Sequence, residues 1–294
     1  MSTAAAGPFA ARHLFVGLFD DAALFPPGNA AMIRAVPAHL GYRGSPDADL
    51  VGPFLCPASR LDELRDALDD ETSLDLVVVV DTGTGGVAGA VAVVAGDDRL
   101  ELRGLEVPLR AEPDLGAAAR RAAAAVLDAV PPDHSTIFVE VPRSESAGAA
   151  LDVLAEYDLA AKLRTGGADP SAYPTEDEIA EFVVSCLDRE IAFKLTAGLH
   201  KAVRNTAAET GFEQHGFVNL LLAVSVALAG GDRALVAVEL ADRDAQAVAD
   251  RARRLSTDRA AQIRSWLRSV GTCSIREPID DLVTIGLVPG TASR

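Results

Sequence analysis

The sequence contains little lysine, little cysteine and no long apolar run. Its 294 residues include three lysines beside 24 arginines, so arginine serves wherever a solvated cation suffices. The three cysteines, Cys56, Cys186 and Cys273, are odd in number and far apart, without the spacing of a metal site. We therefore expect reduced thiols and a cytoplasmic protein. The longest apolar run, residues 217–229, is interrupted twice by polar residues and is shorter than the roughly 18 residues of a membrane-spanning helix.

Positive charge is also scarce, because the formal net charge at pH 7 is −16. An acidic surface repels the phosphates of nucleic acids and anionic lipids, so we expect neither nucleic acid nor a membrane as a partner. The N-terminus lacks a charged segment followed by a long apolar core, so we expect no signal peptide. The expected partner is a small molecule. A homo-oligomer is compatible with the sequence, but nothing in it specifies one.

What the sequence does contain is a strand followed by a helix, repeated eight times. Apolar runs typical of strands begin near residues 14, 51, 76, 102, 136, 160, 191 and 270. One of the helices between them begins after Thr175, where Glu178 completes a capping box. Eight such units predict an α/β fold in which a parallel sheet closes into a TIM (β/α)8 barrel, because right-handed crossovers place every helix outside.

The chain has no linker rich in proline, glycine or serine, so we predict a single barrel domain over residues 1–294. The segment 232–268 is rich in Arg and Asp, and we expect it to be a peripheral helical insertion before the last strand. In this fold the active site lies where the carboxyl ends of the strands meet the following loops.

Two of the three lysines occupy equivalent places in neighbouring units. Lys162 lies in the segment 160–167 and Lys194 in the segment 191–200, and each follows a short apolar run and precedes a Thr and a Gly. Both lysines therefore fall where a predicted strand, the sixth or the seventh, gives way to a loop at the barrel mouth. Because lysine is so rare in this sequence, we expect the two lysines at the barrel mouth to have a chemical role.

Four carboxylates are expected around the same mouth. Asp20 and Asp21 end the first predicted strand, and Glu106 and Glu140 each interrupt an apolar strand. A buried carboxylate is costly unless it is paired, so the two glutamates need cationic or hydrogen-bonding partners. The alternatives are turn or helix-capping carboxylates for the aspartates and structural ion pairs for the glutamates.

A lysine at a barrel mouth can form a Schiff base with a carbonyl substrate, provided that the attacking amine is unprotonated. Parallel strands lie about 4.8 Å apart, so two lysines on adjacent strands can influence each other, and the one that stays charged favours proton loss from the other. Glu106 lies across the barrel and can transfer protons to the substrate. In the alternative interpretation, each lysine makes a structural salt bridge with Glu106 or Glu140.

Six of the predicted strands each contain a short motif. The motifs are Phe-Leu-Cys56-Pro, Leu-Glu106-Val, Phe-Val-Glu140, Lys162-x-x-Thr165-Gly166, Lys194-x-Thr196-x-Gly198 and Gly271-Thr-Cys-Ser274. This set resembles the corresponding strands of deoxyribose-phosphate aldolase, a class I aldolase. By this resemblance Lys162 forms the Schiff base, Lys194 perturbs it, and Glu106, an aspartate in that family, moves protons.

The resemblance also implies where a substrate binds. The phosphate-binding backbone and hydroxyl groups of the family correspond to Gly166, Gly167, Gly198 and Ser274. Arg164 replaces a small polar residue of the family, which predicts a different substrate. The complete set of predicted substrate-binding residues is Asp20, Asp21, Glu140, Arg164, Thr165, Gly166, Gly167, Thr196, Gly198, His200, Lys201 and Ser274.

Four cations follow the two lysine strands. Arg164, His200, Lys201 and Arg204 could together hold a carboxylate or a phosphate in an otherwise acidic protein. The alternative is that they are ordinary cations of exposed loops.

These observations predict a Schiff-base carbon–carbon lyase, similar to an aldolase, that acts on a small phosphorylated or carboxylated aldehyde or ketone without a cofactor. One alternative is a barrel lyase or isomerase that holds a divalent metal through Asp20, Asp21, Glu140 or His200. The other is a barrel without catalysis that binds a small molecule or acts as a scaffold.

Overall fold

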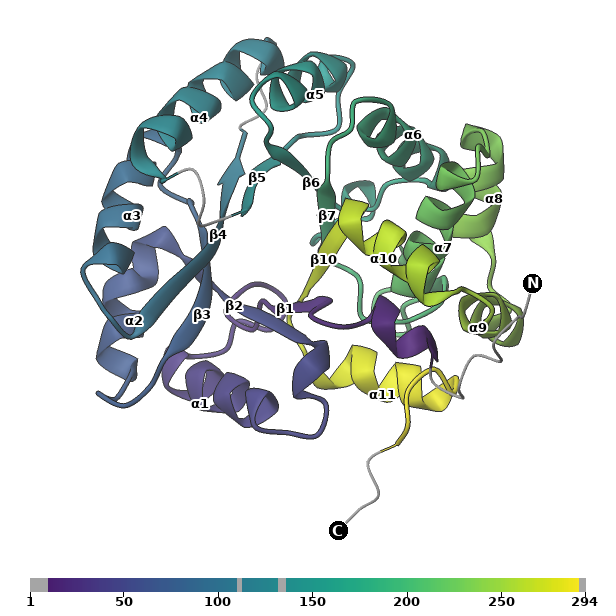
Figure 1. The fold of residues 1–294 in the computed structure, drawn as a ribbon, viewed down its shortest axis with the longest axis horizontal. Coiled ribbons are helices and arrows are strands. Elements are labelled where there is room, and N and C mark those ends of the chain that lie inside the picture. The colour runs from purple at the N-terminus through teal and green to yellow at the C-terminus, as the bar shows by residue number, and fades with distance from the viewer. Residues whose placement is uncertain (1–9, 110–112, 132–135, 291–294) are drawn as a thin grey trace.

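Eight parallel strands close into a barrel in a computed structural model that describes residues 10–109, 113–131 and 136–290. Around the barrel the order is β1, β10, β7, β6, β5, β4, β3 and β2, which returns to β1. The strands are β1 (Phe19–Asp21), β2 (Val51–Pro57), β3 (Leu74–Val79), β4 (Leu100–Pro108), β5 (Thr136–Glu140), β6 (Ala160–Arg164), β7 (Phe193–Thr196) and β10 (Leu267–Thr272). The predicted TIM (β/α)8 barrel is thus confirmed (Figure 1).

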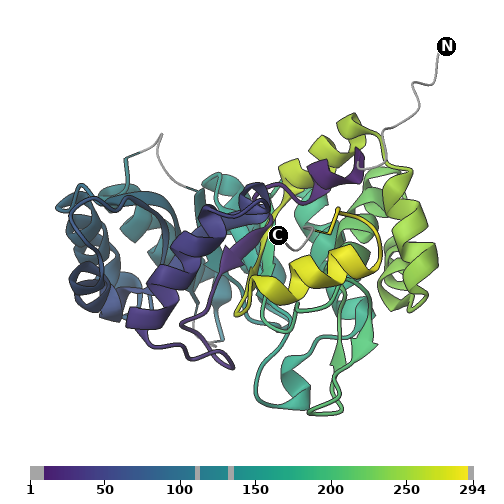
Figure 2. The same cartoon turned by 90° about the horizontal axis from the view of Figure 1, so that it is seen from below.

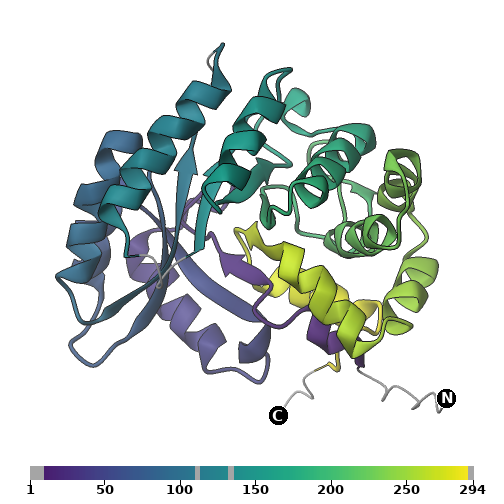
Figure 3. The same cartoon turned by 45° about the horizontal axis from the view of Figure 1, so that its top comes forward.

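The helices that connect the strands form an outer ring around the sheet, as Figures 1 and 3 show. They are α1 (Met32–Arg43), α2 (Leu61–Ala67), α3 (Val87–Ala95), α4 (Leu115–Ala129), α5 (Ala147–Glu156), α6 (Glu176–Asp188), α7 (Phe217–Leu228) and α11 (Arg276–Thr284). The capping box predicted for α6 is present, since Thr175 accepts from the backbone N–H of Glu178 and the Glu178 carboxylate accepts from that of Thr175.

The prediction that the first strand begins near residue 14 is wrong. Residues Ala10–Leu14 form a short 3-10 helix, η1, and β1 begins only at Phe19. Gly17 causes the difference, because its φ of +56° breaks the extended run and its N–H donates to Asp49 O at 2.7 Å. Asp20 and Asp21 still end the strand, as predicted, but they make up two of the three residues of β1.

The chain between β7 and β10 contains more than one helix. A small hairpin of β8 (Asn205–Thr206) and β9 (Glu213–Gln214) precedes α7. The segment 232–268, which we interpret as an insertion, contains α8 (Arg233–Ala241), α9 (Ala245–Arg253), α10 (Thr257–Trp266) and the first two residues of β10. Helix α8 packs on α6 and α7, whereas α10 packs on η1, α7 and β10.

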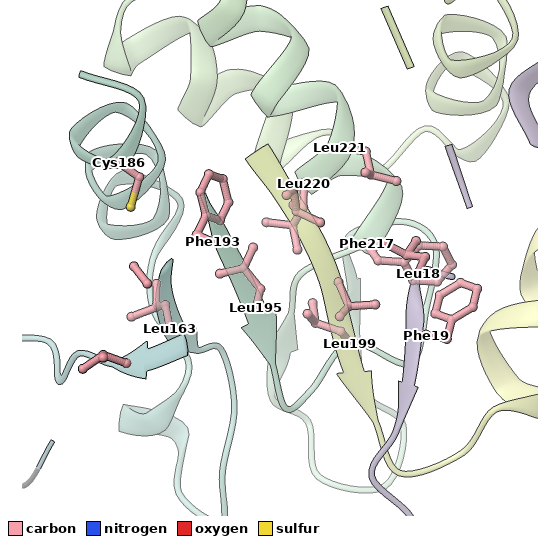
Figure 4. Packing of buried hydrophobic residues seen from close by; sticks show 14 of the residues in the cluster. Leu18, Phe19, Leu163, Cys186, Phe193, Leu195, Leu199, Phe217, Leu220 and Leu221 are labelled. Carbon is pink, nitrogen blue, oxygen red and sulfur yellow. The ribbon is translucent and has the colours of Figure 1, made fainter. Parts of the chain in front are cut away.

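The main apolar core lies between the sheet and the helices, because the side chains of each strand alternate between two faces. On β7, Phe193 and Leu195 pack outwards among residues such as Cys186 of α6 and Leu220 of α7 (Figure 4). The intervening Lys194 therefore points into the barrel, as does Thr196 at the strand end.

The loops that follow β6 and β7 project on one side of the barrel, where Figure 2 shows them in teal and green. They include the short 3-10 helix η5 (Pro170–Ala172) and the β8–β9 hairpin. This side carries the carboxyl ends of the strands. Among the residues described, none of the helices is both long and apolar enough to cross a membrane.

Candidate active site

The two lysines lie side by side across the sheet. Lys162 of β6 pairs in register with Lys194 of β7, and Glu140 of β5 pairs with Lys162. Glu106 of β4 pairs with Phe138, two residues before Glu140, so Glu106 lies deeper in the barrel than Glu140. Four strands that are consecutive around the barrel thus direct charged side chains into one part of its interior.

These four side chains and Asp20 of β1 form a continuous network, which we call the charged cluster. Lys162 Nζ donates to Glu106 Oε2 and lies 2.8 Å from Glu140 Oε2. Lys194 Nζ donates to Asp20 Oδ2 and lies 2.7 Å from Glu106 Oε1. Glu106 therefore bridges the two lysines, each through a different carboxylate oxygen.

Small residues on β2 and β10 make room for the deepest part of the charged cluster. Gly52 lies against Asp20, and a Cβ at this position would collide with Asp20 Oδ1. Ser269 of β10 donates to Asp20 Oδ2 at 2.6 Å. A Cβ on Gly271 would lie 2.7 Å from Thr196 Oγ1, so a larger residue there would crowd the interior. These small residues let Lys194 reach past β10 to Asp20 on β1.

Burial and charge act in opposite directions on the ionisable groups of the charged cluster. Burial alone would raise the pKa of Glu106, but the ammonium groups of Lys162 and Lys194 lower it to about 2. Burial would lower the pKa of Lys194, but the carboxylates of Asp20 and Glu106 raise it above the ordinary lysine value. Lys194 is therefore charged at neutral pH, and the ring of Phe138 lies 5.2 Å from its Nζ.

Asp20 differs from Glu106 because it has only one lysine beside it. Burial raises its pKa, and Lys194 and Ser269 offset this only in part, while the negative charge of Glu106 adds to it. With three carboxylates and two ammonium groups, the charged cluster has one negative charge in excess when every member is ionised. Asp20 is thus the member best suited to hold an additional proton.

The charged cluster opens to solvent at one end. The Glu140 side chain is 17% exposed, whereas that of Lys162 is 4% and that of Lys194 is fully buried. Glu140 is the last residue of β5, so this end lies at the carboxyl side of the barrel. A molecule that enters from that side meets Glu140 and Lys162 before it meets Lys194.

The structure brings together the three predicted catalytic residues, Lys162, Lys194 and Glu106, with two of the predicted substrate-binding residues, Asp20 and Glu140. Each lysine also forms an ion pair with a glutamate, as the alternative of purely structural salt bridges requires. The same contacts therefore fit both a Schiff-base site and structural salt bridges, and the two differ in the energetics of the charged cluster.

Asp21 does not join the other carboxylates. It points to the opposite face of β1 from Asp20, and its Oδ2 lies 3.1 Å from His39 Nδ1 of α1, with both side chains buried. Its Oδ1 accepts from the N–H of Ala23 at 3.1 Å. Asp21 therefore attaches α1 and the following loop to the sheet.

The predicted phosphate-binding glycines allow the loops after β6 and β7 to pack closely against each other. A Cβ on Gly166 would lie 3.1 Å from the Gly198 backbone, and Gly198 itself has a φ of +72° with Tyr173 over it. Thr165 Oγ1 donates to Ala197 O at 2.6 Å, and Ala197 also has a positive φ. A Cβ on Gly167 would lie 2.7 Å from Ala172 Cβ of η5. These residues therefore hold the loops after β6 and β7 together.

Three of the predicted cations after the lysine strands pair with carboxylates of two helices, α11 and α6. His200 Nδ1 lies 3.0 Å from Glu277 of α11, and Lys201 Nζ lies 3.7 Å from Asp281 of the same helix. Arg204 pairs with Glu176 of α6 at 2.6 Å.

Two further predicted binding residues follow β6 and β10. Arg164 is exposed at the end of β6. Ser274 Oγ accepts from the N–H of Glu277 at 3.3 Å, at the start of α11.

Three residues that shape the site escaped the sequence analysis. Ser269, Gly52 and Phe138 contact the charged cluster or make room for it. Ser269 and Gly271 alternate along the last strand, and small residues at every second position of a buried strand indicate a face that leaves space. Phe138 and Gly52 carry no comparable local signal.

Within residues 10–109, 113–131 and 136–290, no three His, Cys, Asp or Glu side chains are grouped so that they could hold a metal ion. These residues therefore provide no ligand set for the alternative of a metal-dependent barrel enzyme.

Comparison with known proteins gives no family assignment: no family model matches the chain, and no match is found among the curated proteins or the solved structures.

Proposed function

We propose that this protein is a Schiff-base carbon–carbon lyase of the class I aldolase type, in which Lys162 attacks the carbonyl carbon of a small aldehyde or ketone. The observation that carries the proposal is the bridge of Glu106 between Lys162 and Lys194 inside the barrel. It places an amine, two proton acceptors and a fixed positive charge within contact distance of one another.

The chemistry would begin with transfer of one proton from the Lys162 ammonium to Glu140, its more exposed carboxylate partner, while Glu106 stays ionised. The free amine then adds to the carbonyl carbon to give a carbinolamine, and the carboxylic acid returns a proton as water leaves. The product is an iminium ion, which carries the same positive charge as the ammonium that it replaces. The two carboxylates that pair with Lys162 would therefore stabilise the iminium as well.

The iminium acts as an electron sink for the next step. Either a carbon–carbon bond beta to the iminium carbon breaks and its electron pair forms an enamine, or an enamine attacks a second carbonyl compound. Each direction requires one proton to be taken up or released near the iminium. Glu140 supports this role because it contacts Lys162 at 2.8 Å and is the most exposed carboxylate of the charged cluster.

Lys194 is the less suitable nucleophile. Its side chain is fully buried, whereas that of Lys162 is 4% exposed and contacts Glu140, the most exposed carboxylate of the charged cluster. A substrate that enters from the Glu140 side therefore reaches Lys162 first. We assign Lys194 a positioning role, in which its charge holds Glu106 and Asp20 in place.

The energetics favour a functional cluster over a structural one. Burying ion pairs costs desolvation energy, and replacing such pairs with apolar residues of similar volume is often neutral or stabilising. A largely buried cluster of five ionisable groups is therefore poor design for stability alone. Perturbed pKa values inside a barrel, as at Glu106 and Lys194, are typical of catalytic sites.

Reductive trapping tests this proposal. The protein is incubated with a panel of small aldehydes and ketones, treated with borohydride, and digested for peptide mass measurement. We expect at least one carbonyl compound to leave a covalent adduct on the peptide that contains Lys162. Lys162→Arg keeps the positive charge but removes the primary amine, so the adduct is expected to fall to background.

Lys201→Arg is the matched control, because Lys201 is half-exposed and pairs with Asp281 at the surface. Its trapping yield is expected to equal that of the unaltered protein. An adduct that persists in the Lys162→Arg protein, or one found on Lys194 instead, would remove Lys162 from the role of nucleophile.

A further inference from the structure

The interior of the barrel has a second face that the charged cluster does not use. Ala22, Leu55, Val77 and Val79 form an apolar group of their own, separate from the main core, and Phe25 packs against it half-buried. We call these five residues the apolar wall. They come from β2, β3 and the loop that follows β1.

The apolar wall faces the barrel interior rather than the helices. Along β3, the residues that alternate with Val77 and Val79 belong to the main core under the helices. The Val77 side chain lies 3.5 Å from the position of a Cβ on Gly104, which is on the same face of β4 as Glu106. Leu55 lies 3.9 Å from the position of a Cβ on Gly271, beside Thr196.

The apolar wall and the charged cluster lie at the same depth. Val79 pairs in register with Glu106, the carboxylate that bridges the two lysines. Val79 and Ala22 each retain 8% exposure at the carboxyl side, the side on which Glu140 is exposed. The interior is thus divided into a charged half and an apolar half that are reached from the same end of the barrel.

Two of the cations that could hold a phosphate are paired with carboxylates, and the hydroxyl of Ser274 accepts from the backbone at the start of α11. Lys201 and Arg204 are neutralised by Asp281 and Glu176. A phosphorylated substrate would bring two negative charges to a protein whose charged cluster already has a negative charge in excess.

We infer that the apolar wall is the subsite for a hydrocarbon substituent, and that the substrates of Lys162 are non-phosphorylated aldehydes or ketones carrying an aliphatic or aryl group. This inference rests on the proposed Schiff-base function. The carbonyl group contacts Lys162 and Glu140, while the apolar substituent extends across the interior to Val79 and Leu55.

The test is a series of straight-chain aldehydes from propanal to hexanal, compared with glyceraldehyde 3-phosphate. The rate of reductive trapping on Lys162 is measured at limiting aldehyde. It is divided by the rate for Nα-acetyl-lysine, whose ε-amine is free, and this removes differences in the intrinsic reactivity of the aldehydes. Each methylene that moves from water onto an apolar surface is expected to increase trapping about fourfold. The phosphorylated aldehyde is expected to be trapped less efficiently than butanal.

Val79→Thr changes the apolar wall with almost no change in volume. It is expected to flatten the dependence on chain length while propanal is still trapped. Val78→Thr is the matched control, because it adds the same hydroxyl one residue away on the face that packs under the helices. Its chain-length dependence is expected to match that of the unaltered protein.

The outcomes separate the two proposals. If no carbonyl compound is trapped on Lys162, the proposed function fails and the inference fails with it. If Lys162 is trapped but chain length has no effect, or the phosphorylated aldehyde is preferred, the apolar subsite is wrong while the Schiff-base function stands. The series with the unaltered protein gives this answer even if Val79→Thr does not fold.

Discussion

Glu106 connects the two lysines of the site, and its properties follow from that position. Each of its carboxylate oxygens contacts a different lysine, Oε2 contacting Lys162 and Oε1 contacting Lys194. A carboxylate that is fully buried and paired with two ammonium groups is much more acidic than a free one. The ionisation of Glu106 is therefore coupled to the stability of the folded barrel.

Glu106→Gln should change how stability depends on pH. The pKa of Glu106 is about 2 in the folded protein against an ordinary 4.5. Its ionisation stabilises the folded state above about pH 4.5, and this contribution disappears as the pH falls towards 2. We expect the difference in unfolding free energy between the two proteins to shrink by on the order of 3 kcal/mol over that interval.

Urea denaturation at several pH values between 2 and 6 measures this difference. Glu101→Gln is the control, because Glu101 is an exposed residue of the same strand. A constant difference between Glu106→Gln and the unaltered protein from pH 6 to pH 2 would show that Glu106 titrates as a free carboxylate.

The sequence predicted some of these residues better than others. Lys162 and Lys194 were recognisable because lysine is scarce, and Glu106 because it interrupts an apolar strand. Asp20 and Asp21 were not distinguishable, since both were predicted at the end of the first strand and no motif indicated which of them faces the interior. Only the true start of β1 at Phe19 assigns Asp20 to the interior and Asp21 to α1.

At the scale of elements, local signals were reliable where the chain itself supplies the hydrogen bonds. The apolar run near residue 51 forms strand Val51–Pro57, and the capping box predicted at Thr175 is present. Ser59 lies just before α2 but does not cap it, because its hydroxyl donates to Asp81 of a different unit instead. A sequence shows which side chains could cap a helix, but not which tertiary partner competes for them.

Helix α6 offers a direct test of a local signal. Thr175→Ala removes the side chain that accepts from the Glu178 N–H, so we expect a loss of about 1 kcal/mol in unfolding free energy. Ser146→Ala is the control, since Ser146 precedes α5 and its side chain makes no hydrogen bond to the backbone of that helix. Chemical denaturation of both variants gives the comparison, and equal losses would contradict the assigned cap.

At the scale of the whole molecule, the barrel is closed by contacts between the two ends of the chain. Strand β1 has three residues and is held by β10 on one side and β2 on the other. Arg264 at the end of α10 reinforces this seam, since it donates to Leu14 O at 2.9 Å and to Leu267 O at 3.1 Å. Such long-range contacts leave no signal in a local stretch of sequence.

Arg264→Lys should weaken the seam although the positive charge is kept. One ammonium group cannot reproduce the planar set of donors that reaches carbonyls on two segments, so at least one buried carbonyl loses its partner. We expect a loss of about 1–3 kcal/mol in unfolding free energy. Arg233→Lys, at an exposed pair with Glu181, should cost less than about 1 kcal/mol. Urea denaturation of both variants checks this, and similar costs would mean that Arg264 does not fasten the barrel.

The ion pair between Asp20 and Lys194 joins residues 174 positions apart in the chain. An open sheet that lacks β1 would leave Lys194 without one of its two carboxylate partners. Docking of β1 supplies Asp20 and completes the sheet at the same time. The arrangement that we assign to chemistry therefore also favours the closed barrel over an incomplete one.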